Sequence, residues 1–313
     1  MTDDPAIAAL AARLGAGAYA RRRRAEEACK PLRRRSSSLY LHVVKAVLSS
    51  DVVRFCFRAS GLHRHGYRQF LDVKVVHHEV RLPRLPPALD GTVILQLSDL
   101  HLDLDPSFVP ALAARLDGLA YDVAVISGDF RNLTLGPWEP SVAGTIRLLG
   151  QLRPPVYAVL GNHDALAMVP PLEAAGLRFL LNEHVVWSRG GADLVLAGVD
   201  DPRHFGSHDV GRALAGAPAD AVRVLLAHSP IVHAEAEAAG VDLLLAGHTH
   251  GGQICLPGGR IVVSSERSPR AYRRGAWQHG RLQGYTSSGT GACGAPLRFH
   301  CPAEITRHIL RRG

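Results

Sequence analysis

Carboxylate, imidazole and amide side chains recur in five short segments of the chain, and each segment directly follows a run of apolar residues. The segments are Ser98-Asp99-Leu100-His101, Gly128-Asp129, Gly161-Asn162-His163-Asp164, His228 and Gly247-His248-Thr249-His250. Taken alone, each has an ordinary explanation, because Gly-Asp is a common turn, Asn and Asp cap helices, and a single histidine often lies in a core. Five such segments after five apolar runs favour one shared metal site, since oxygen and imidazole donors bind divalent ions.

This donor set suits a pair of ions that act on phosphorus. Two divalent ions about 3.5–4 Å apart can bind both the attacking and the leaving oxygen of an in-line displacement. A carboxylate between the ions offsets their repulsion, and a set without thiolate suits Mn, Fe, Zn or Co better than a structural zinc cage. The ions lower the pKa of a bridging water to give hydroxide, and a histidine that binds no metal could protonate the leaving alkoxide. The segments therefore predict metal-dependent hydrolysis of a phosphoester.

The apolar runs have the length and composition of buried strands. They are Thr92–Leu97, Val123–Ser127, Val156–Leu160, Leu194–Gly198, Val222–Ala227 and Val241–Ala246. Helical patterns at Pro106–Leu119 and Val142–Leu152 alternate with the first three runs, which is typical of an α/β domain. An edge strand is expected within Leu71–Leu82, and short strands are expected at Arg260–Ser264, Gln283–Ser287, Leu297–His300 and Glu304–Ile309. Because the carboxyl ends of strands in such a sheet share one edge, the polar segments should converge there.

The net charge of +8 is concentrated near the N-terminus. Residues 1–90 contain 17 Lys and Arg against 8 Asp and Glu, and they include the runs Arg21–Arg24 and Arg33–Arg35. Apolar residues recur at helical spacing from Leu39 to Leu48, and Asp51 could cap a second helix. We expect residues 1–65 to form a basic, partly helical extension and residues 66–313 to form the catalytic domain. The extension either packs on that domain or docks as an amphipathic element on anionic lipid.

The remaining composition bears on the compartment. The five cysteines include no C-x-x-C pair, so we interpret them as buried thiols in a reducing compartment. No apolar run of about 18 residues could span a bilayer, and the first 20 residues do not read as a secretory signal. A cytoplasmic location is expected, with peripheral contact with the inner membrane as an alternative.

The ordered series of segments resembles the calcineurin-like metallophosphoesterase superfamily over residues 91–250. The segment Gly247–Gln253 and the C-terminal stretch Ser288–Ile305 further resemble a bacterial phosphodiesterase-like subfamily. The resemblance implies a four-layer αββα sandwich with a two-metal site at the sheet edges. It implies that one ion is bound by Asp99, His101, Asp129 and His250. It implies that the second is bound by Asp129, Asn162, His228 and His248, with Asp129 bridging. His163 would then act on the leaving group, and Asp164 would orient His163.

Differences between this sequence and two other subfamilies narrow the range of expected metal centres and substrates. Asn132 stands where purple acid phosphatases have an iron-binding tyrosine. Arg131 is present, but the sequence lacks the further arginines that Ser/Thr protein phosphatases carry around these segments. A tyrosinate centre and a phosphoprotein substrate are therefore not expected. Arg203, His204 and His208 follow a predicted strand, where they are either substrate contacts or ordinary surface residues.

Several substrates and activities stay open. The basic N-terminal segment favours a lipid-linked or nucleotide-linked substrate cleaved at a phosphodiester or pyrophosphate bond. A phosphomonoesterase or a cyclic-nucleotide phosphodiesterase is an alternative, since one dimetal core runs all of these reactions. A nuclease is less favoured because the catalytic part is nearly neutral, and a non-catalytic scaffold is disfavoured because every ligand is present. Two divalent ions are expected, Mn first and Fe, Zn, Co or Mg as alternatives.

Overall fold

The computed structural model describes residues 5–28, 61–261 and 266–313. The helices predicted between Leu39 and Phe57, and the basic run Arg33–Arg35, lie outside the described residues. Within the described ranges no helix is both long and apolar enough to cross a membrane.

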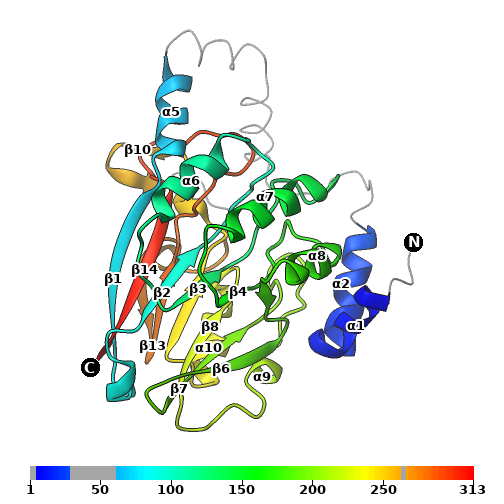
Figure 1. The fold of residues 1–313 in the computed structure, drawn as a ribbon, viewed down its shortest axis with the longest axis vertical. Coiled ribbons are helices and arrows are strands. Elements are labelled where there is room, and N and C mark those ends of the chain that lie inside the picture. The colour runs from blue at the N-terminus through cyan, green and yellow to red at the C-terminus, as the bar shows by residue number, and fades with distance from the viewer. Residues whose placement is uncertain (1–4, 29–60, 262–265) are drawn as a thin grey trace.

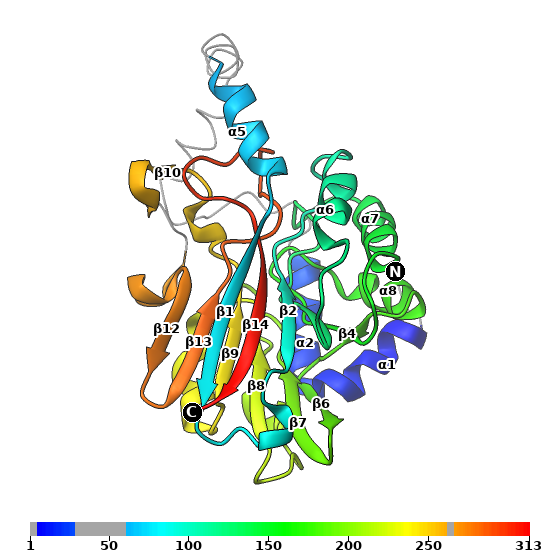
Figure 2. The same cartoon turned by 60° about the vertical axis from the view of Figure 1, so that its left-hand side comes forward.

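Two six-stranded sheets form the centre of the molecule (Figures 1 and 2). In spatial order, the first contains β1 (Lys74–Leu82), β14 (Glu304–Arg312), β2 (Val93–Leu97), β3 (Val123–Ile126), β4 (Val156–Ala158) and β5 (Arg178–Phe179). The second contains β12 (Gly275–His279), β13 (Leu282–Thr286), β9 (Leu243–Ala246), β8 (Val222–Leu226), β7 (Ala192–Gly198) and β6 (Glu183–Arg189). Five of these strands precede the polar segments. Of these, β2, β3 and β4 run parallel to one another, and β8 runs parallel to β9. Their carboxyl ends therefore point to a common edge.

Successive residues of the central strands point to opposite faces of their sheet, and their side chains pack into three apolar clusters. On β3, Val125 joins a cluster between the sheets, whereas Ala124 and Ile126 face the helices outside the first sheet. On β8, Val224 faces the other sheet and Leu225 faces the helices outside the second sheet. Such strands are buried on both faces, which explains their near-continuous apolar runs.

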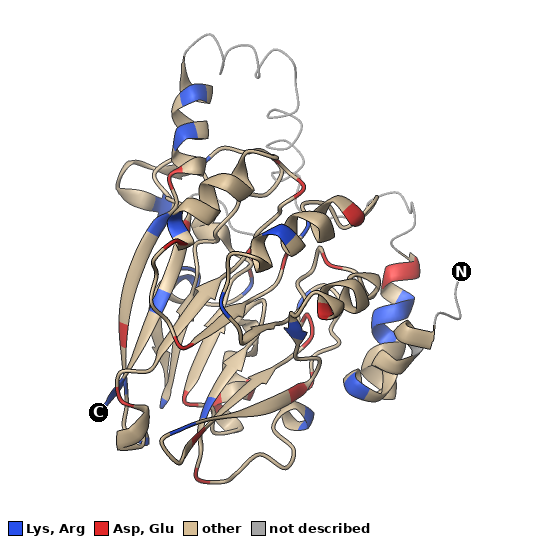
Figure 3. Ribbon diagram, viewed as in Figure 1, with Lys and Arg blue, Asp and Glu red and all other residues tan. Residues whose placement is uncertain are grey.

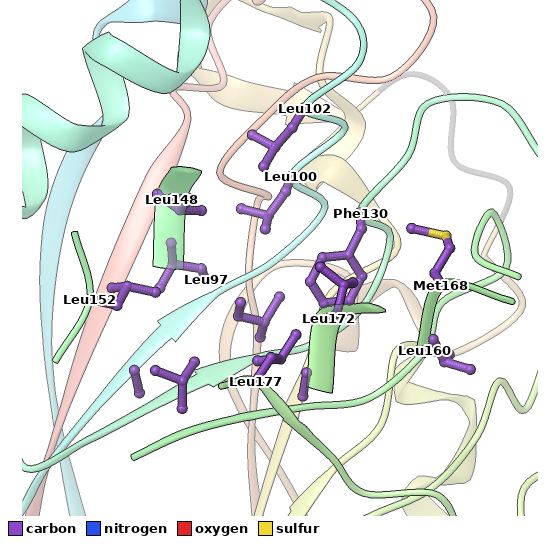
Figure 4. Close-up of a cluster of buried hydrophobic side chains, with 14 of the residues drawn as sticks. Leu97, Leu100, Leu102, Phe130, Leu148, Leu152, Leu160, Met168, Leu172 and Leu177 are labelled. Carbon is purple, nitrogen blue, oxygen red and sulfur yellow. The ribbon is translucent and has the colours of Figure 1, made fainter. Parts of the chain in front are cut away.

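Helices cover the outer face of each sheet. The first sheet is covered by α5 (Leu62–Leu71), α6 (Phe108–Leu116), α7 (Glu139–Leu149) and α8 (Val169–Ala174). The second is covered by α9 (Val210–Ala213) and α10 (His233–Ala238). Figure 4 shows part of the first of these cores, where Leu148 and Leu172 lie in the same cluster as Leu97 and Phe130. These layers confirm the predicted αββα sandwich.

Smaller elements complete the chain. A two-stranded ribbon is formed by β10 (Cys255–Leu256) and β11 (Arg260–Ile261). Short 3-10 turns lie at Pro87–Leu89, Leu166–Met168, Pro230–Val232, His250–Gly252, Pro257–Gly259 and Arg270–Tyr272.

The prediction of a strand at Leu297–His300 is wrong. Only Phe299 pairs there, in an isolated bridge with Ile254. The reason is Arg298, whose fully buried side chain turns inward and donates to the carbonyls of Ser288 and Gly291. The prediction also missed β6 and β12, the two outer strands of the second sheet.

The N-terminal helices α1 (Pro5–Leu14) and α2 (Ala16–Ala28) pack on the body of the molecule. Leu14 is fully buried, and Arg13 pairs with Glu173 on α8 and Glu183 on β6. Helix α5 spans the predicted boundary between residues 65 and 66, so the division into extension and catalytic domain stays a prediction.

Candidate metal centre

The five predicted segments meet where β2, β3, β4, β8 and β9 end. Their strands end at Leu97, Ile126, Ala158, Leu226 and Ala246, between two and four residues before the first polar side chain of interest. Five of the side chains sit on left-handed backbone, at Asp99 (φ 52°), His101 (φ 45°), Asp129 (φ 59°), His248 (φ 70°) and His250 (φ 51°). Non-glycine residues rarely adopt this conformation, and such strain gathers at functional sites.

Two glycines allow the ligand-bearing loops to approach one another. A Cβ on Gly161 would lie 2.2 Å from Oδ1 of Asp129, and one on Gly247 would lie 2.5 Å from Oδ2 of Asp99. Both distances are far shorter than any real contact, so no larger residue fits. The glycines of the Gly-Asn-His-Asp and Gly-His-x-His segments are therefore required by this close packing.

One group of donors surrounds the Asp129 carboxylate on the side of the second sheet. Its Oδ2 lies 3.1 Å from Nε2 of His228. That imidazole nitrogen is 3.2 Å from Oδ1 of Asn162 and 3.3 Å from Nδ1 of His248. The ligand atoms of Asp129, His228 and His248 all lie within 4.8 Å of one another, which is close enough for one ion to join them.

A second group shares the same carboxylate. Nε2 of His250 is 3.3 Å from Oδ1 of Asp99 and 3.1 Å from Nε2 of His101. The ligand atoms of Asp99, His101 and Asp129 also lie within 4.8 Å of one another. Asp129 thus belongs to both groups, the position that the family resemblance implies for a bridging ligand.

Hydrogen bonds outside the centre orient the imidazoles. Nδ1 of His101 lies 2.6 Å from the carbonyl of Arg131, and Nδ1 of His228 lies 2.8 Å from the carbonyl of Ser127. A carbonyl only accepts, so Nδ1 carries a proton in both rings and Nε2 faces the centre. His248 is turned the other way, with Nδ1 inward and Nε2 3.8 Å from the buried carboxylate of Glu266.

Electrostatics also suit bound cations. Burial lowers the pKa of His101 to about 3 and holds those of His248 and His250 well below their ordinary value, so these rings are neutral donors. Burial alone would raise the pKa of Asp129, but His228 and the neighbouring imidazoles outweigh it and hold that pKa well below its usual range. Burial likewise opposes charge on His228, yet Asp129 raises its pKa to about 10.

The buried carboxylates of Asp99 and Asp129 therefore favour positive charge in the site. Within the described residues, the ion pairs of Asp99 and Asp129 are with histidines alone. A proton on His228 meets part of this demand, and divalent ions would meet it in full. Buried carboxylate, neutral imidazole and amide donors in two overlapping groups fit a pair of divalent ions.

The two residues predicted to be catalytic occupy different places. Nε2 of His163 lies 3.9 Å from Oδ2 of Asp129, and its side chain keeps 19% of its surface exposed at the mouth of the centre. Asp164 does not take the expected position beside that ring. Its carboxylate accepts from the backbone N–H groups of Asp129, Phe130 and Gly161, at 2.7–2.9 Å. Nδ1 of His163 instead lies 3.1 Å from the hydroxyl of Thr134.

Three contributors were not found by sequence reasoning. Thr134 and Glu266 belong to no recognisable motif, and their contacts arise only when loops meet in the fold. Cys293 was interpreted as a buried thiol, but it is half-buried and its Sγ lies 4.0 Å from Nε2 of His163. The ligand atoms of Cys293, His101 and His250 all lie within 4.8 Å of one another. Its position within Ser288–Ile305, the stretch that resembles the bacterial phosphodiesterase-like subfamily, was the available signal.

Comparisons with known proteins agree with this geometry. A family model described as calcineurin-like phosphoesterase matches residues 92–252, about half of the chain. The chain is 35% identical to a bovine (Bos taurus) transmembrane protein with metallophosphoesterase domain, over 74% of this chain and 56% of that protein. It is 29% identical to the Bacillus subtilis uncharacterized metallophosphoesterase YkoQ, over 78% of this chain and 92% of that protein. The chain thus spans just over half the length of the bovine relative.

Among solved structures, the chain is similar to the NAD nucleotidase of Haemophilus influenzae. The TM-score is 0.45 and the sequence identity is 14%, over 64% of this chain and 46% of that protein.

Proposed function

We propose that this chain, which belongs to the calcineurin-like phosphoesterase family and is a metal-dependent phosphoester hydrolase, cleaves a phosphodiester or pyrophosphate bond at a two-ion centre. The observation that carries the proposal is the place of Asp129 in both groups of metal-ligating atoms. A single structural ion would not need a carboxylate shared in this way, whereas paired ions do.

The proposed ligands follow the two groups. Asp99, His101, Asp129 and His250 would hold one ion, and Asp129, Asn162, His228 and His248 would hold the other. When bound, the ions would supply Lewis-acid stabilisation of the phosphoryl oxygens and acidify an attacking water. Oxygen and nitrogen donors of this kind suit Mn, Fe, Zn or Co, with Mn our first expectation.

His163 is proposed to assist the leaving oxygen. Its ring is the partly exposed imidazole beside Asp129, so substrate can reach it, and the Thr134 hydroxyl fixes its orientation through Nδ1. Nε2 is thereby left to face the reacting phosphoryl group, where it would donate a proton or a hydrogen bond. Asp164 is proposed to shape the centre by holding the loops of Asp129 and Gly161 together.

A substrate panel tests the reaction. Protein reconstituted with Mn²⁺ should hydrolyse bis-p-nitrophenyl phosphate faster than p-nitrophenyl phosphate, and a pyrophosphate diester should separate the two proposed bond types. A preference for the monoester would replace the proposal with a phosphomonoesterase. Failure to cleave any of these phosphoesters after loading with two ions per chain would contradict the proposed activity.

Arg203 is proposed to contact a phosphoryl oxygen of the substrate. Arg203 is half-buried in the loop after β7, and after burial and His228 its positive charge is a further cause that lowers the pKa of His248. Arg203→Met should lower kcat/KM by about 10-fold to 100-fold, since a hydrogen bond to a charged group contributes about 1.5–3 kcal/mol. Arg178→Met, on the exposed edge strand β5, is the matched control and should leave kcat/KM unchanged.

Peripheral contact with anionic lipid is a further proposal for the N-terminal segment. Arg21 and Arg24 are exposed on α2, and Figure 3 shows Lys and Arg positions along the ribbons of α2 and α5. Replacing Arg33–Arg35 by Gln should reduce flotation of the protein with vesicles rich in phosphatidylglycerol. Its flotation with neutral vesicles should not change. A variant with Arg178, Arg260 and Arg281 replaced by Gln loses equal charge elsewhere; equal losses in both variants would contradict a specific role for the segment.

A further inference from the structure

Cys293 lies beside two proposed metal ligands that come from different sheets. His101 follows β2 and His250 follows β9, and their Nε2 atoms face each other at 3.1 Å. The ligand atom of Cys293 is within 4.8 Å of the ligand atoms of both rings. Metal bonds of about 2.3 Å to sulfur and about 2.0 Å to nitrogen allow donors on one ion to be up to about 4.3 Å apart. Since the two imidazole nitrogens are 3.1 Å apart, a sulfur bound to the same ion can lie at most about 3.9 Å from both, so a shift of about 1 Å or less would bring all three onto one ion.

The backbone of Cys293 is held in place by the loops that carry the ligands. Its N–H donates to Oε1 of Gln253 at 2.8 Å, and Nε2 of Gln253 donates back to its carbonyl at 3.0 Å. The next residue, Gly294, donates its N–H to Oδ1 of Asn132 at 2.7 Å. Gln253 stands three residues after His250, and Asn132 stands three residues after Asp129. The backbone that carries the thiol is thus held from both sides of the centre, which restricts where a ligand sulfur can lie.

From this geometry we infer that Cys293 is an additional ligand of the ion held by His101 and His250. This inference rests on the proposed two-ion centre. On binding, the thiol releases its proton to solvent and the sulfur lone pair forms the bond to the metal, with no change of oxidation state. The sulfur donor is absent from the ligand set expected from the sequence. It shifts the preference of that ion from Mn²⁺ or Mg²⁺ toward Zn²⁺, Fe²⁺ or Co²⁺, because thiolates select softer metals.

Cobalt spectroscopy tests the inference without relying on turnover. The metal-free protein is titrated with Co²⁺, whose visible d–d bands report occupancy and whose near-ultraviolet charge-transfer band reports a bound thiolate. The wild-type protein should show both features. Cys293→Ser should bind cobalt and keep visible bands but lose the charge-transfer band. Cys255→Ala removes a buried thiol that donates to the Gly251 carbonyl, and this control should keep both features.

Competition between metals gives the second measurement. Cys293→Ser should lose about 10-fold or more in Zn²⁺ affinity and much less in Mn²⁺ affinity, since even outer contacts of a metal site contribute about 10-fold to 100-fold. Identical near-ultraviolet spectra of the wild-type protein and Cys293→Ser would overturn the inference but leave the two-ion centre standing. Wild-type protein that binds no cobalt would overturn the proposed centre itself, and the inference with it.

Discussion

Asp129 is the residue on which the proposed two-ion centre depends, because its carboxylate is shared by two groups of possible metal ligands. Asp129→Asn keeps the shape of the side chain but removes the negative charge that lies 3.1 Å from His228. We expect this variant to bind fewer than two ions per chain and to lose more than about 100-fold in activity, since a direct ligand matters more than an outer contact.

Metal content per chain, measured after reconstitution and desalting, checks this prediction. Asp105→Asn is the control, because Asp105 accepts from the backbone of Ser107 on the surface and should not affect loading. Full occupancy of both sites in Asp129→Asn would contradict the shared position.

His163 should separate chemistry from metal binding. His163→Gln removes the partly exposed ring near Asp129 but none of the proposed ligands. Occupancy should stay at the wild-type value, while kcat falls about 100-fold to 10,000-fold, the usual contribution of a positioned general acid.

Two comparisons sharpen the test of His163. Substrates with a more acidic leaving group should be affected less, since their leaving oxygen needs less protonation. A variant that loses metal in proportion to activity would indicate that His163 supports the ions instead.

At the scale of elements, the sequence indicated which strands carry the centre. Strands such as β3 and β8 are buried on both faces, so their apolar runs end abruptly where the polar ligands begin. Outer strands lack that signature: on β6 the buried residue is Val185, the other positions are half-buried or exposed, and this strand was missed. Cys293 and Glu266 could not be predicted either, because tertiary packing brings loops without periodicity to the centre.

Helix α2 also departs from its sequence-based interpretation. The run Arg21–Arg24 was counted as part of a basic N-terminal extension, yet the Arg22 side chain is fully buried. Its guanidinium donates to Oδ1 of Asp200 at 2.9 Å and to the carbonyl of Asp164 at 2.7 Å, and it lies 3.5 Å from the ring centre of Phe205. The helix is therefore tied to the same loop that holds Asp129 and Gly161.

Replacing this arginine should destabilise the fold. Arg22→Met leaves the buried carboxylate of Asp200 without its cation, and breaking such a pair costs about 3–5 kcal/mol. The free energy of unfolding from urea denaturation should fall by that amount. Arg24→Met changes an exposed residue of the same helix and should stay within about 0.5 kcal/mol of the wild-type value. Equal stability of the two variants would show that the buried pair contributes nothing.

At the scale of the whole molecule, polar side chains are also buried between the sheets. His308 on β14 is fully buried, with Nε2 2.9 Å from Oε1 of Gln96 on β2 and Nδ1 3.0 Å from Nδ1 of His78 on β1. Its ring also packs edge-on against Tyr285 on β13. Burial first, and then the neighbouring His78, hold the pKa of His308 well below its ordinary value of 6.5.

Stability should therefore fall in mild acid. Below pH 6.5 the unfolded chain binds a proton at His308 that the folded chain does not bind, so the free energy of unfolding decreases as the pH falls. The contribution of this single group is at most about 1.4 kcal/mol per pH unit. His308→Gln keeps a neutral polar side chain beside Gln96 and removes the titration, so its stability should fall less steeply between about pH 6.5 and about pH 5.

Urea denaturation across that range measures the slope for each protein. His77→Gln is the matched control, because His77 is the neighbour of His78 on β1 and is exposed. The imidazoles of the metal centre titrate in the wild-type protein and in both variants, so the difference between slopes belongs to His308. If the free energy of unfolding of His308→Gln fell with pH as steeply as that of the control, protonation of His308 would make no contribution to the loss of stability in mild acid.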